Sequence, residues 1–147
     1  MSKYEEANLI LKLYELRREE TMRAARDWFF REFNPESLED VNKVMFSERS
    51  GHLRMVLTYW DMAAALVNNG AISMEMFNET NGEHFSVYAK MEPIIKEVRN
   101  SYGPQFVANL QKLIETTPGG TQRSAAIRER MKGIRAQLAA RQNGSDS

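Results

Sequence analysis

The amino-acid sequence predicts an all-α fold: an irregular helical bundle of about five to seven helices, with a long N-terminal helix and a C-terminal helical tail. Three observations lead to this prediction. The segment 3–33 contains neither glycine nor proline. Apolar residues recur at three- and four-residue intervals through the segment 52–70. Proline and glycine gather in short breaks, at 35, 103–104 and 118–120, where helices are expected to end.

The segment 52–70, with the sequence HLRMVLTYWDMAAALVNNG, is expected to be the central, buried helix of the bundle. The asparagine–glycine pair at 69–70 ends it, since glycine reaches the left-handed conformation at no steric cost. Tyr59 and Trp60 carry large apolar area, but each requires a polar partner if it is buried. The apolar residues fall on one stripe at helical spacing: Leu53, Val56, Leu57, Trp60, Ala63, Ala64 and Val67.

Asp61 lies at the edge of this stripe and has three interpretations. It is a solvated residue, or it pairs with an arginine on a neighbouring helix, or it belongs to a site. Arg99 is the candidate partner, because it lies beside the apolar stripe of the segment 83–102. In the third interpretation, a pocket between the two helices would be lined by Tyr59, Trp60, Asp61 and Arg99.

The N-terminal helix is predicted over residues 3–33, which gives a length of roughly 45 Å. It carries two apolar bands separated by the polar stretch 17–20. The second band, around Trp28 and Phe29, is expected to join the core. The first band, around Leu13, is expected to pack either on this chain or on a second copy of it.

Shorter helices are predicted on both sides of the central one. Pro35 ends the first helix, and a serine at 37 begins a short helix to about residue 46. Another short helix opens at 72. The segment 83–102 keeps apolar residues at alternating four- and three-residue spacing, with a kink or a break expected at Pro93. The last core helix follows the break at 103–104.

A domain boundary is predicted at the Thr-Pro-Gly-Gly sequence 117–120. Residues 1–117 form the helical bundle domain. Residues 118–147 form a glycine linker and a basic amphipathic tail helix, with a disordered end from 143. This tail holds six bases and two acids, so it carries a net charge of +4. Its apolar residues form one narrow seam at 4-3-4 spacing: Ile127, Met131, Ile134 and Leu138.

The basic tail has three interpretations. It folds back as a solvated helix on the chain's own acidic body, it docks on another protein or on a second copy, or it contacts nucleic-acid phosphates. No aromatic residues are interleaved with its bases, which makes nucleic acid the least favoured partner.

The composition excludes several classes of protein. The chain has 147 residues, of which 27% are charged and 42% hydrophobic, as in one globular domain. Its twenty basic and twenty acidic residues balance, which argues against a nucleic-acid binder with a wholly basic surface. The absence of cysteine excludes disulfides, cysteine-ligated zinc and thiol catalysis. No apolar run approaches the roughly 20 residues of a membrane span, and the acidic N-terminus is unlike a signal peptide, so a cytoplasmic location is expected.

The sequence lacks the motifs that carry chemistry. His52 and His84 are far apart, and Glu48, four residues before His52, adds too few ligands for a metal site. Phosphate-binding and dinucleotide-binding fingerprints and the nucleophile elbow are also missing. No catalytic residue, cofactor or metal is therefore expected. The nine methionines fill an irregular core or line an adaptable groove, and the core is the favoured interpretation.

Two runs of residues are similar to a known family. The run VLTYWDMA at 56–63 is followed by a glycine turn and by Met76-Phe77, and MEPII at 91–95 is followed by Arg99 and by Tyr-Gly-Pro. In this order they resemble the uncharacterised bacterial family known as domain of unknown function 4760, over residues 36–115. These are packing motifs, so the resemblance implies no activity and no catalytic residues. Members of that family often carry membrane segments ahead of the domain, where this chain is expected to have a soluble helix.

The leading functional hypothesis is a non-enzymatic helical interaction or regulatory module that self-associates or binds a protein partner. Its working surface would be the outer part of the N-terminal helix and the basic tail, because both carry apolar seams that the compact middle leaves open. The alternative is a small-molecule-binding protein or an enzyme, with the pocket of Tyr59, Trp60, Asp61 and Arg99.

Overall fold

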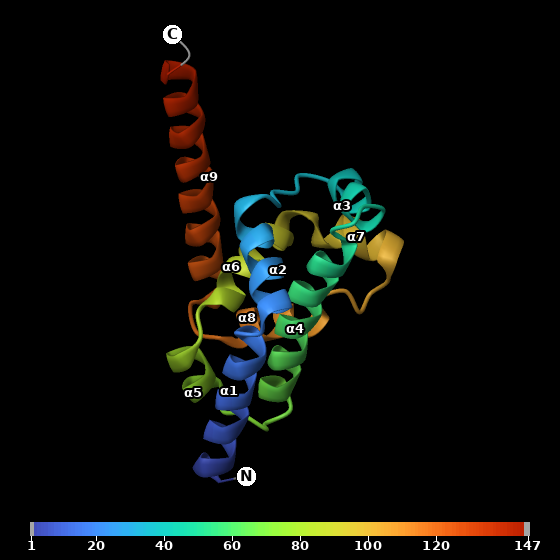
Figure 1. The fold of residues 1–147 in the computed structure, drawn as a ribbon. Coiled ribbons are helices and arrows are strands. Elements are labelled where there is room, and N and C mark those ends of the chain that lie inside the picture. Colours follow the sequence, from blue (N-terminus) through green and yellow to red (C-terminus); the bar gives the residue numbers. More distant parts are fainter. Residues whose placement is uncertain (1, 146–147) are drawn as a thin grey trace.

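The structure, a computed structural model, describes residues 2–145 (Figure 1). Within this range the chain forms nine α-helices, one 3-10 turn and no strand, which confirms the all-α prediction, although the number of helices exceeds the predicted range. The elements are α1 (Lys3–Arg17), α2 (Glu20–Arg31), α3 (Leu38–Met45), α4 (Ser50–Asn68), α5 (Met74–Thr80), α6 (Glu83–Met91), η1 (Glu92–Ile94), α7 (Ile95–Tyr102), α8 (Ala108–Thr116) and α9 (Gly120–Ser145).

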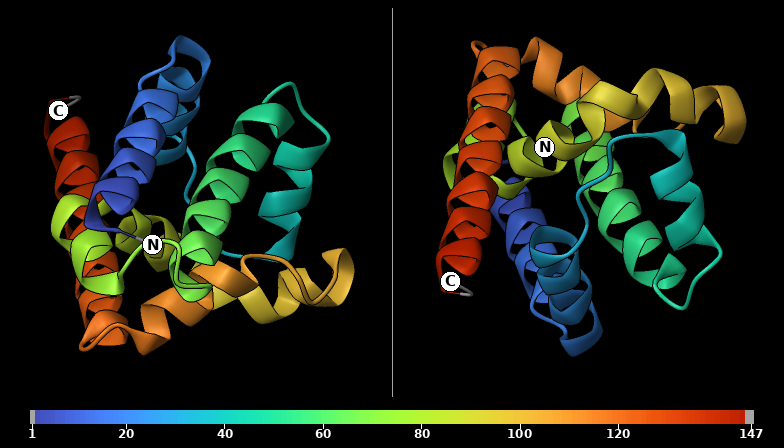
Figure 2. Two further views of the ribbon diagram at one scale, coloured as in Figure 1. Left: turned by 90° about the horizontal axis from the view of Figure 1, so that it is seen from below. Right: turned by 90° about the horizontal axis from the view of Figure 1, so that it is seen from above.

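Helix α4 lies at the centre of the bundle, as predicted. It packs against α2 and, most extensively, against α8, which crosses it (Figure 2). Trp60 is only 1% exposed, and Val56, Ala63 and Ala64 are fully buried. The apolar stripe read from the sequence is therefore the face that forms the core.

The single long helix predicted over residues 3–33 is wrong, because the chain breaks between α1 and α2. The carboxylate of Glu19 accepts hydrogen bonds from the backbone N–H groups of Thr21 and Met22, at 3.1 Å each, and so begins a new helix. The guanidinium of Arg26 donates to the carbonyl of Arg17 at 3.3 Å and so holds the end of α1. The polar stretch that separates the two apolar bands thus contains the caps of two helices.

Two further helix ends are held by side chains from distant helices. The buried carboxylate of Glu6 on α1 accepts the backbone N–H of Ser73, which caps α5, at 2.6 Å. This bond lowers the pKa of Glu6. The buried ammonium of Lys90 on α6 donates to the carbonyls of Phe29 at 2.9 Å and Phe33 at 2.7 Å, just where α2 ends. Burial lowers the pKa of Lys90 to about 8.

The break predicted at Pro93 is present. The 3-10 turn η1 contains this proline and separates α6 from α7, since proline removes one backbone donor from the helix. Helix α7 then leaves the direction of α6 and packs against α3. One predicted helix therefore becomes two.

The predicted glycine linker is a tight turn into α9. The N–H of Gly120 donates to the carbonyl of Thr117 at 2.9 Å. A Cβ atom on Gly120 would collide with the carbonyl oxygen of Ile114, so only glycine fits this position. The boundary between residues 117 and 118 stays a prediction. Residues 143–145 continue α9 as a helix, which corrects the disorder expected for them, and Asp146 and Ser147 lie outside the described residues.

Among residues 2–145, no helix combines the length and the apolar character that a membrane crossing requires.

Candidate functional site

Tyr59 and Trp60 are both buried, and both find the polar partner that the sequence analysis requires of them. The hydroxyl of Tyr59 donates to the carbonyl of Leu13 at 2.6 Å. The indole N–H of Trp60 donates to the carboxylate of Glu83 at 3.0 Å. Both side chains therefore fasten α4 to neighbouring helices.

The predicted ion pair between Asp61 and Arg99 is not formed. The carboxylate of Asp61 instead accepts the backbone N–H of Leu110 at 2.9 Å and the amide of Asn109 at 3.2 Å. The guanidinium of Arg99 donates to the carbonyl of Phe106 at 2.9 Å. Arg99 therefore binds the backbone just before α8, and Asp61 binds a backbone N–H in the first turn of α8.

Helix α8 needs such an external cap. Its N-cap residue is Val107, which has no side-chain acceptor and adopts the left-handed conformation with φ 46°. The N-terminus of a helix carries unpaired N–H groups and a partial positive charge, and a carboxylate satisfies both. Asp61 supplies that carboxylate from α4, so it acts as a structural fastener.

The four residues of the predicted pocket do not share a cavity. Asp61 lines a cavity of about 450 Å³ between α3, α4 and the segment 105–107. Tyr59 lines a separate, shallow one of about 440 Å³ between α2 and α4. Arg99 lines a third, of about 400 Å³, beside α6 and α7. Of the four residues of the predicted pocket, only Asp61 lines the cavity between α3, α4 and the segment 105–107.

Replacing Asp61 by alanine is expected to lower the free energy of unfolding by about 1–2 kcal/mol, the usual cost of losing an N-cap. The measurement is urea unfolding followed by circular dichroism. Asp61→Asn is the matched control, because its amide oxygen can still accept the N–H of Leu110, and it should lose less than half as much. Equal losses in the two variants would show that the capping oxygen is not what matters at this position.

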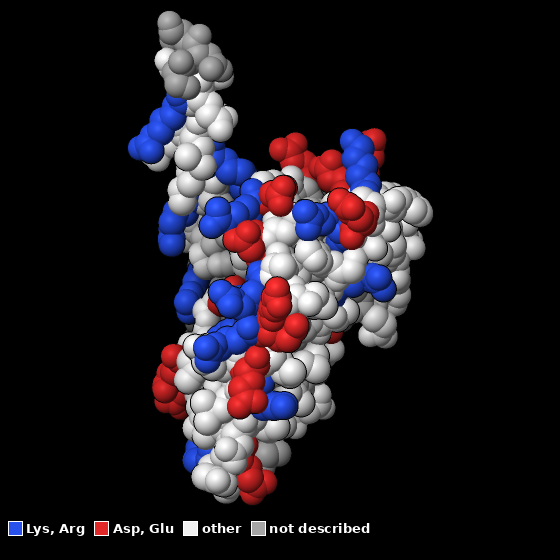
Figure 3. Space-filling view, viewed as in Figure 1, with Lys and Arg blue, Asp and Glu red and all other residues white. Residues whose placement is uncertain are grey.

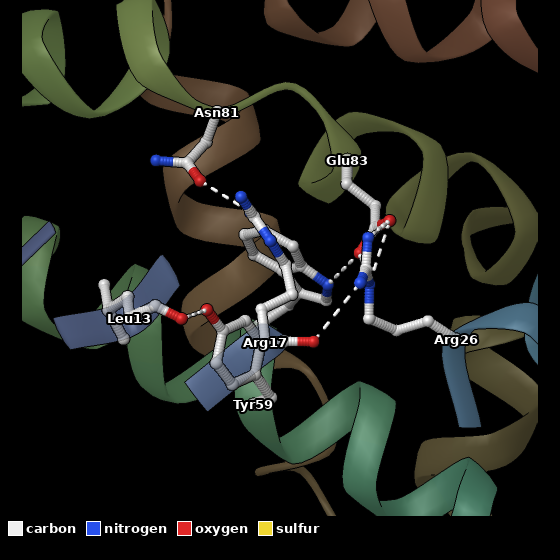
Figure 4. Close-up of polar contacts among 7 residues, drawn as sticks. Leu13, Arg17, Arg26, Tyr59, Asn81 and Glu83 are labelled. Atoms are coloured by element: carbon white, nitrogen blue, oxygen red, sulfur yellow. Dashed lines mark hydrogen bonds and ion pairs between the residues drawn. The ribbon is translucent and has the colours of Figure 1, made fainter. Parts of the chain in front are cut away.

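The indole of Trp60 contacts Glu83 and Arg17, which belong to the network of polar side chains that Figure 4 labels. The guanidinium of Arg26 on α2 forms an ion pair with Glu83 at 2.8 Å, with both side chains mostly buried. The guanidinium of Arg17 lies 5.4 Å from the centre of the Trp60 ring and donates to Asn81 at 2.8 Å. The network thus joins α1, α2, α4 and the start of α6.

The electrostatics of this network favour a structural role. The carboxylate of Glu83 raises the pKa of Arg26, so the guanidinium stays charged. Burial raises the pKa of Tyr59 to about 12, so its hydroxyl keeps its proton at neutral pH. Neither group is poised to exchange a proton near pH 7, as a general acid or base would be.

His84 lies in an aromatic cage beside this network. It is fully buried, with ring centroids 4.3 Å from Phe85, 4.9 Å from Phe77 and 5.8 Å from Trp60. Its Nε2 lies 2.9 Å from the amide oxygen of Asn78, while its Nδ1 is buried without a hydrogen-bond partner among the described residues.

The hydrogen bonds beyond Asn78 fix the tautomer of His84. The hydroxyl of Thr117 donates to the carbonyl of Leu113 at 2.7 Å, so its oxygen can accept the amide N–H of Asn78 at 3.2 Å. The amide oxygen of Asn78 therefore faces His84, whose Nε2 carries the proton. Burial, followed by the charges of Arg123 and Arg17, lowers the pKa of His84 to about 3.

Sequence reasoning did not find Glu83, Arg26 and Lys90. Each lies far along the chain from the group that it holds, so no local spacing marks it. One signal was available: a buried tryptophan requires an acceptor for its N–H, and that acceptor proved to be Glu83.

Across residues 2–145, no three histidine, aspartate or glutamate side chains are grouped so that they could hold a metal ion.

A family model described as a domain of unknown function (DUF4760) matches residues 4–117. The chain belongs to this family. The match to the DUF4760 domain begins in α1 and ends in the turn before α9, so it extends further toward the N-terminus than the resemblance seen in the sequence. No match was found among curated proteins or among solved structures.

Proposed function

We propose that this chain is a non-enzymatic helical interaction module, which binds a helix of another chain along the projecting half of α9. The observation that carries the proposal is an apolar seam that continues past the body of the domain. Ile134 and Leu138 are 51% and 52% exposed on this part of α9.

The first half of α9 is part of the body. The hydroxyl of Ser124 is buried and donates to the carbonyl of Phe85 at 3.1 Å, and Ile127 packs against the core. Arg128 donates to the carbonyl of Ala89 at 3.2 Å near the end of α6. Helix α6 therefore covers the beginning of the seam.

The second half of α9 extends beyond the body (Figure 1). Helix α6 ends at Met91, Glu92 at the start of η1 pairs with Arg128 at 3.3 Å, and α7 then turns away from α9, so the seam loses its cover after Met131. Two large apolar side chains on one face of a projecting helix are a usual feature of helix–helix recognition.

The cytoplasmic location expected from the sequence stays a prediction.

A peptide titration tests the proposal. The probe is a fluorescent three-heptad helical peptide with isoleucine and leucine at its seam positions and glutamine at the flanking positions. We expect it to bind the whole chain and to bind I134S/L138S at least about tenfold more weakly, since each lost apolar contact is worth about 1 kcal/mol or more. Y4S/L11S on α1 is the matched control, because it removes two exposed apolar residues elsewhere. Equal affinity for the wild type and I134S/L138S would contradict the proposal.

A second candidate function is small-molecule binding in the 450 Å³ cavity beside Asp61. Apolar residues such as Leu53 and Leu57 line it, and so does Val107, whose left-handed backbone is strained for a β-branched residue. A fragment screen by nuclear magnetic resonance tests this candidate. Selective shifts of the Leu53 and Leu57 signals would favour it, and the absence of such shifts would remove it.

A further inference from the structure

We infer that the helix bound by α9 comes from a different, acidic protein, and that a second copy of this chain is not the occupant. This inference rests on the proposed function and names the partner of the same seam. It follows from the charges beside the seam and from a basic cavity where the seam leaves the body.

The seam defines a heptad register. Ile127 and Ile134 take the d positions, and Met131 and Leu138 take the a positions. The flanking e and g positions decide which helices can pair, because they face the partner's flanks. On α9 these positions hold Arg128, Arg135 and Gln142 at e, and Arg130, Gln137 and Gly144 at g.

Every charged residue at these flanking positions is an arginine. In a parallel pair of two α9 helices, Arg130 of one copy would face Arg135 of the other, and an antiparallel pair would also bring arginines together. Like charges across such a seam are destabilising. A partner helix with glutamate or aspartate on its flanks would instead form ion pairs with Arg130 and Arg135, whereas Arg128 is already paired with Glu92 at 3.3 Å. The charge pattern therefore selects an acidic helix over a second copy.

The whole projecting part has the same sign of charge. Residues 130–145 contain four bases and no acid, and Arg130 and Arg141 form no ion pair within residues 2–145. On the face drawn in Figure 3, Lys and Arg side chains follow α9 as it leaves the body. An acidic partner would be attracted along this part of the helix.

A basic cavity lies where the covered and uncovered parts of the seam meet. It has a volume of about 250 Å³ and is lined by four bases, Lys90, Arg128, Lys132 and Arg135, by one acid, Glu36, and by Met131 of the seam. A partner helix laid along Ile134 and Leu138 would end against this cavity. The C-terminus of a helix is negative, so its last turn suits such a lining.

Nucleic acid is a poorer occupant of this surface. Phosphates would use the arginines but would leave Ile134 and Leu138 exposed to water. Helix α9 also has no aromatic residue on which a base could stack. A protein helix, in contrast, would cover the apolar seam between the arginines with apolar side chains of its own.

The test compares three peptides with the same apolar seam and with glutamate, glutamine or lysine at the flanking positions. Fluorescence anisotropy with the whole chain is expected to show that the glutamate peptide binds at least about tenfold more tightly than the glutamine peptide, and that the lysine peptide is weakest. Arg130→Glu/Arg135→Glu, which inverts both flanking charges on the uncovered part of the seam, should reverse this order. Lys96→Glu/Lys112→Glu, which changes two exposed residues on α7 and α8 by the same charge, should preserve it.

The peptide series separates a wrong choice of partner from a wrong choice of binding surface. If the glutamine peptide binds through the seam and the glutamate peptide is no tighter, the inference is overturned while the proposed function stands. If none of the three peptides binds, both are overturned. Sedimentation velocity should give a monomer over a concentration series, and a dimer abolished by I134S/L138S would make a second copy the occupant. Tight binding of a 20-base-pair DNA duplex that survives I134S/L138S would assign α9 to nucleic acid instead.

Discussion

Replacing Glu83 by alanine is expected to lower the free energy of unfolding by about 3 kcal/mol, near the low end for a broken buried ion pair. The substitution removes the partner of the Arg26 guanidinium and the acceptor of the Trp60 indole N–H. The smaller loss is expected because the pair is not fully buried: the side chain of Arg26 is 26% exposed to solvent, and that of Glu83 is 20% exposed. Urea unfolding followed by tryptophan fluorescence and by circular dichroism measures this loss.

Asp27→Ala is the matched control for Glu83→Ala. It also breaks an ion pair that involves α2, with Arg31 at 2.7 Å, but both of those side chains are mostly exposed. Such exposed pairs contribute about 0.5 kcal/mol or less. Combining Glu83→Ala with Arg26→Ala should recover part of the loss, because the unpaired cation is then gone. A loss below about 1 kcal/mol for Glu83→Ala alone would mean that water replaces the carboxylate.

The fold is expected to lose stability on acidification through His84. The pKa of His84 is about 3 in the folded chain, well below the ordinary value of 6.5. The unfolded chain therefore binds a proton between these values while the folded chain does not. Stability is retained above about pH 6.5 and declines as the pH falls toward 3, by up to about 4 kcal/mol, at about 1.4 kcal/mol for each pKa unit.

The chain's two histidines provide the control. His84→Gln keeps an N–H donor that can reach Asn78 but cannot titrate, so the acid-side decline should become shallower between pH 6.5 and 4. His52→Gln changes the histidine that lies partly exposed on α4 and should retain the decline. Free energies of unfolding at pH 7, 5.5 and 4 compare the three proteins. Parallel pH profiles for the wild type and His84→Gln would show that His84 is protonated in the folded chain as easily as in the unfolded one.

The sequence contains enough information for the architecture because helices have a local signature. The stripe around Trp60 and the break at Pro93 follow from spacing within one segment. The break at Glu19 has no such signature. Its neighbours are all compatible with a helix, and only the capping bonds of Glu19 and the contact of Arg26 with Arg17 decide it.

The candidate site was less predictable, because its contacts join residues from different helices and leave no pattern within one segment. The need of Trp60 for a polar partner was visible, whereas the identity of that partner depends on how α6 packs against α4. The sequence left Asp61 as a solvated residue, as the partner of an arginine or as part of a site, and none of these interpretations included the capping of α8 that the structure shows. A carboxylate can accept from a guanidinium or from a backbone N–H, and only the packing of two helices decides between them.

Hydrogen exchange measured with and without the glutamate-flanked peptide shows whether this chain binds a partner helix through the exposed apolar seam of α9. We expect slower amide exchange confined to residues 130–142, with no change in α1 and in the segment 105–110 beside Asp61. Protection of α1 or of that segment, with α9 exchanging as before, would contradict binding through α9.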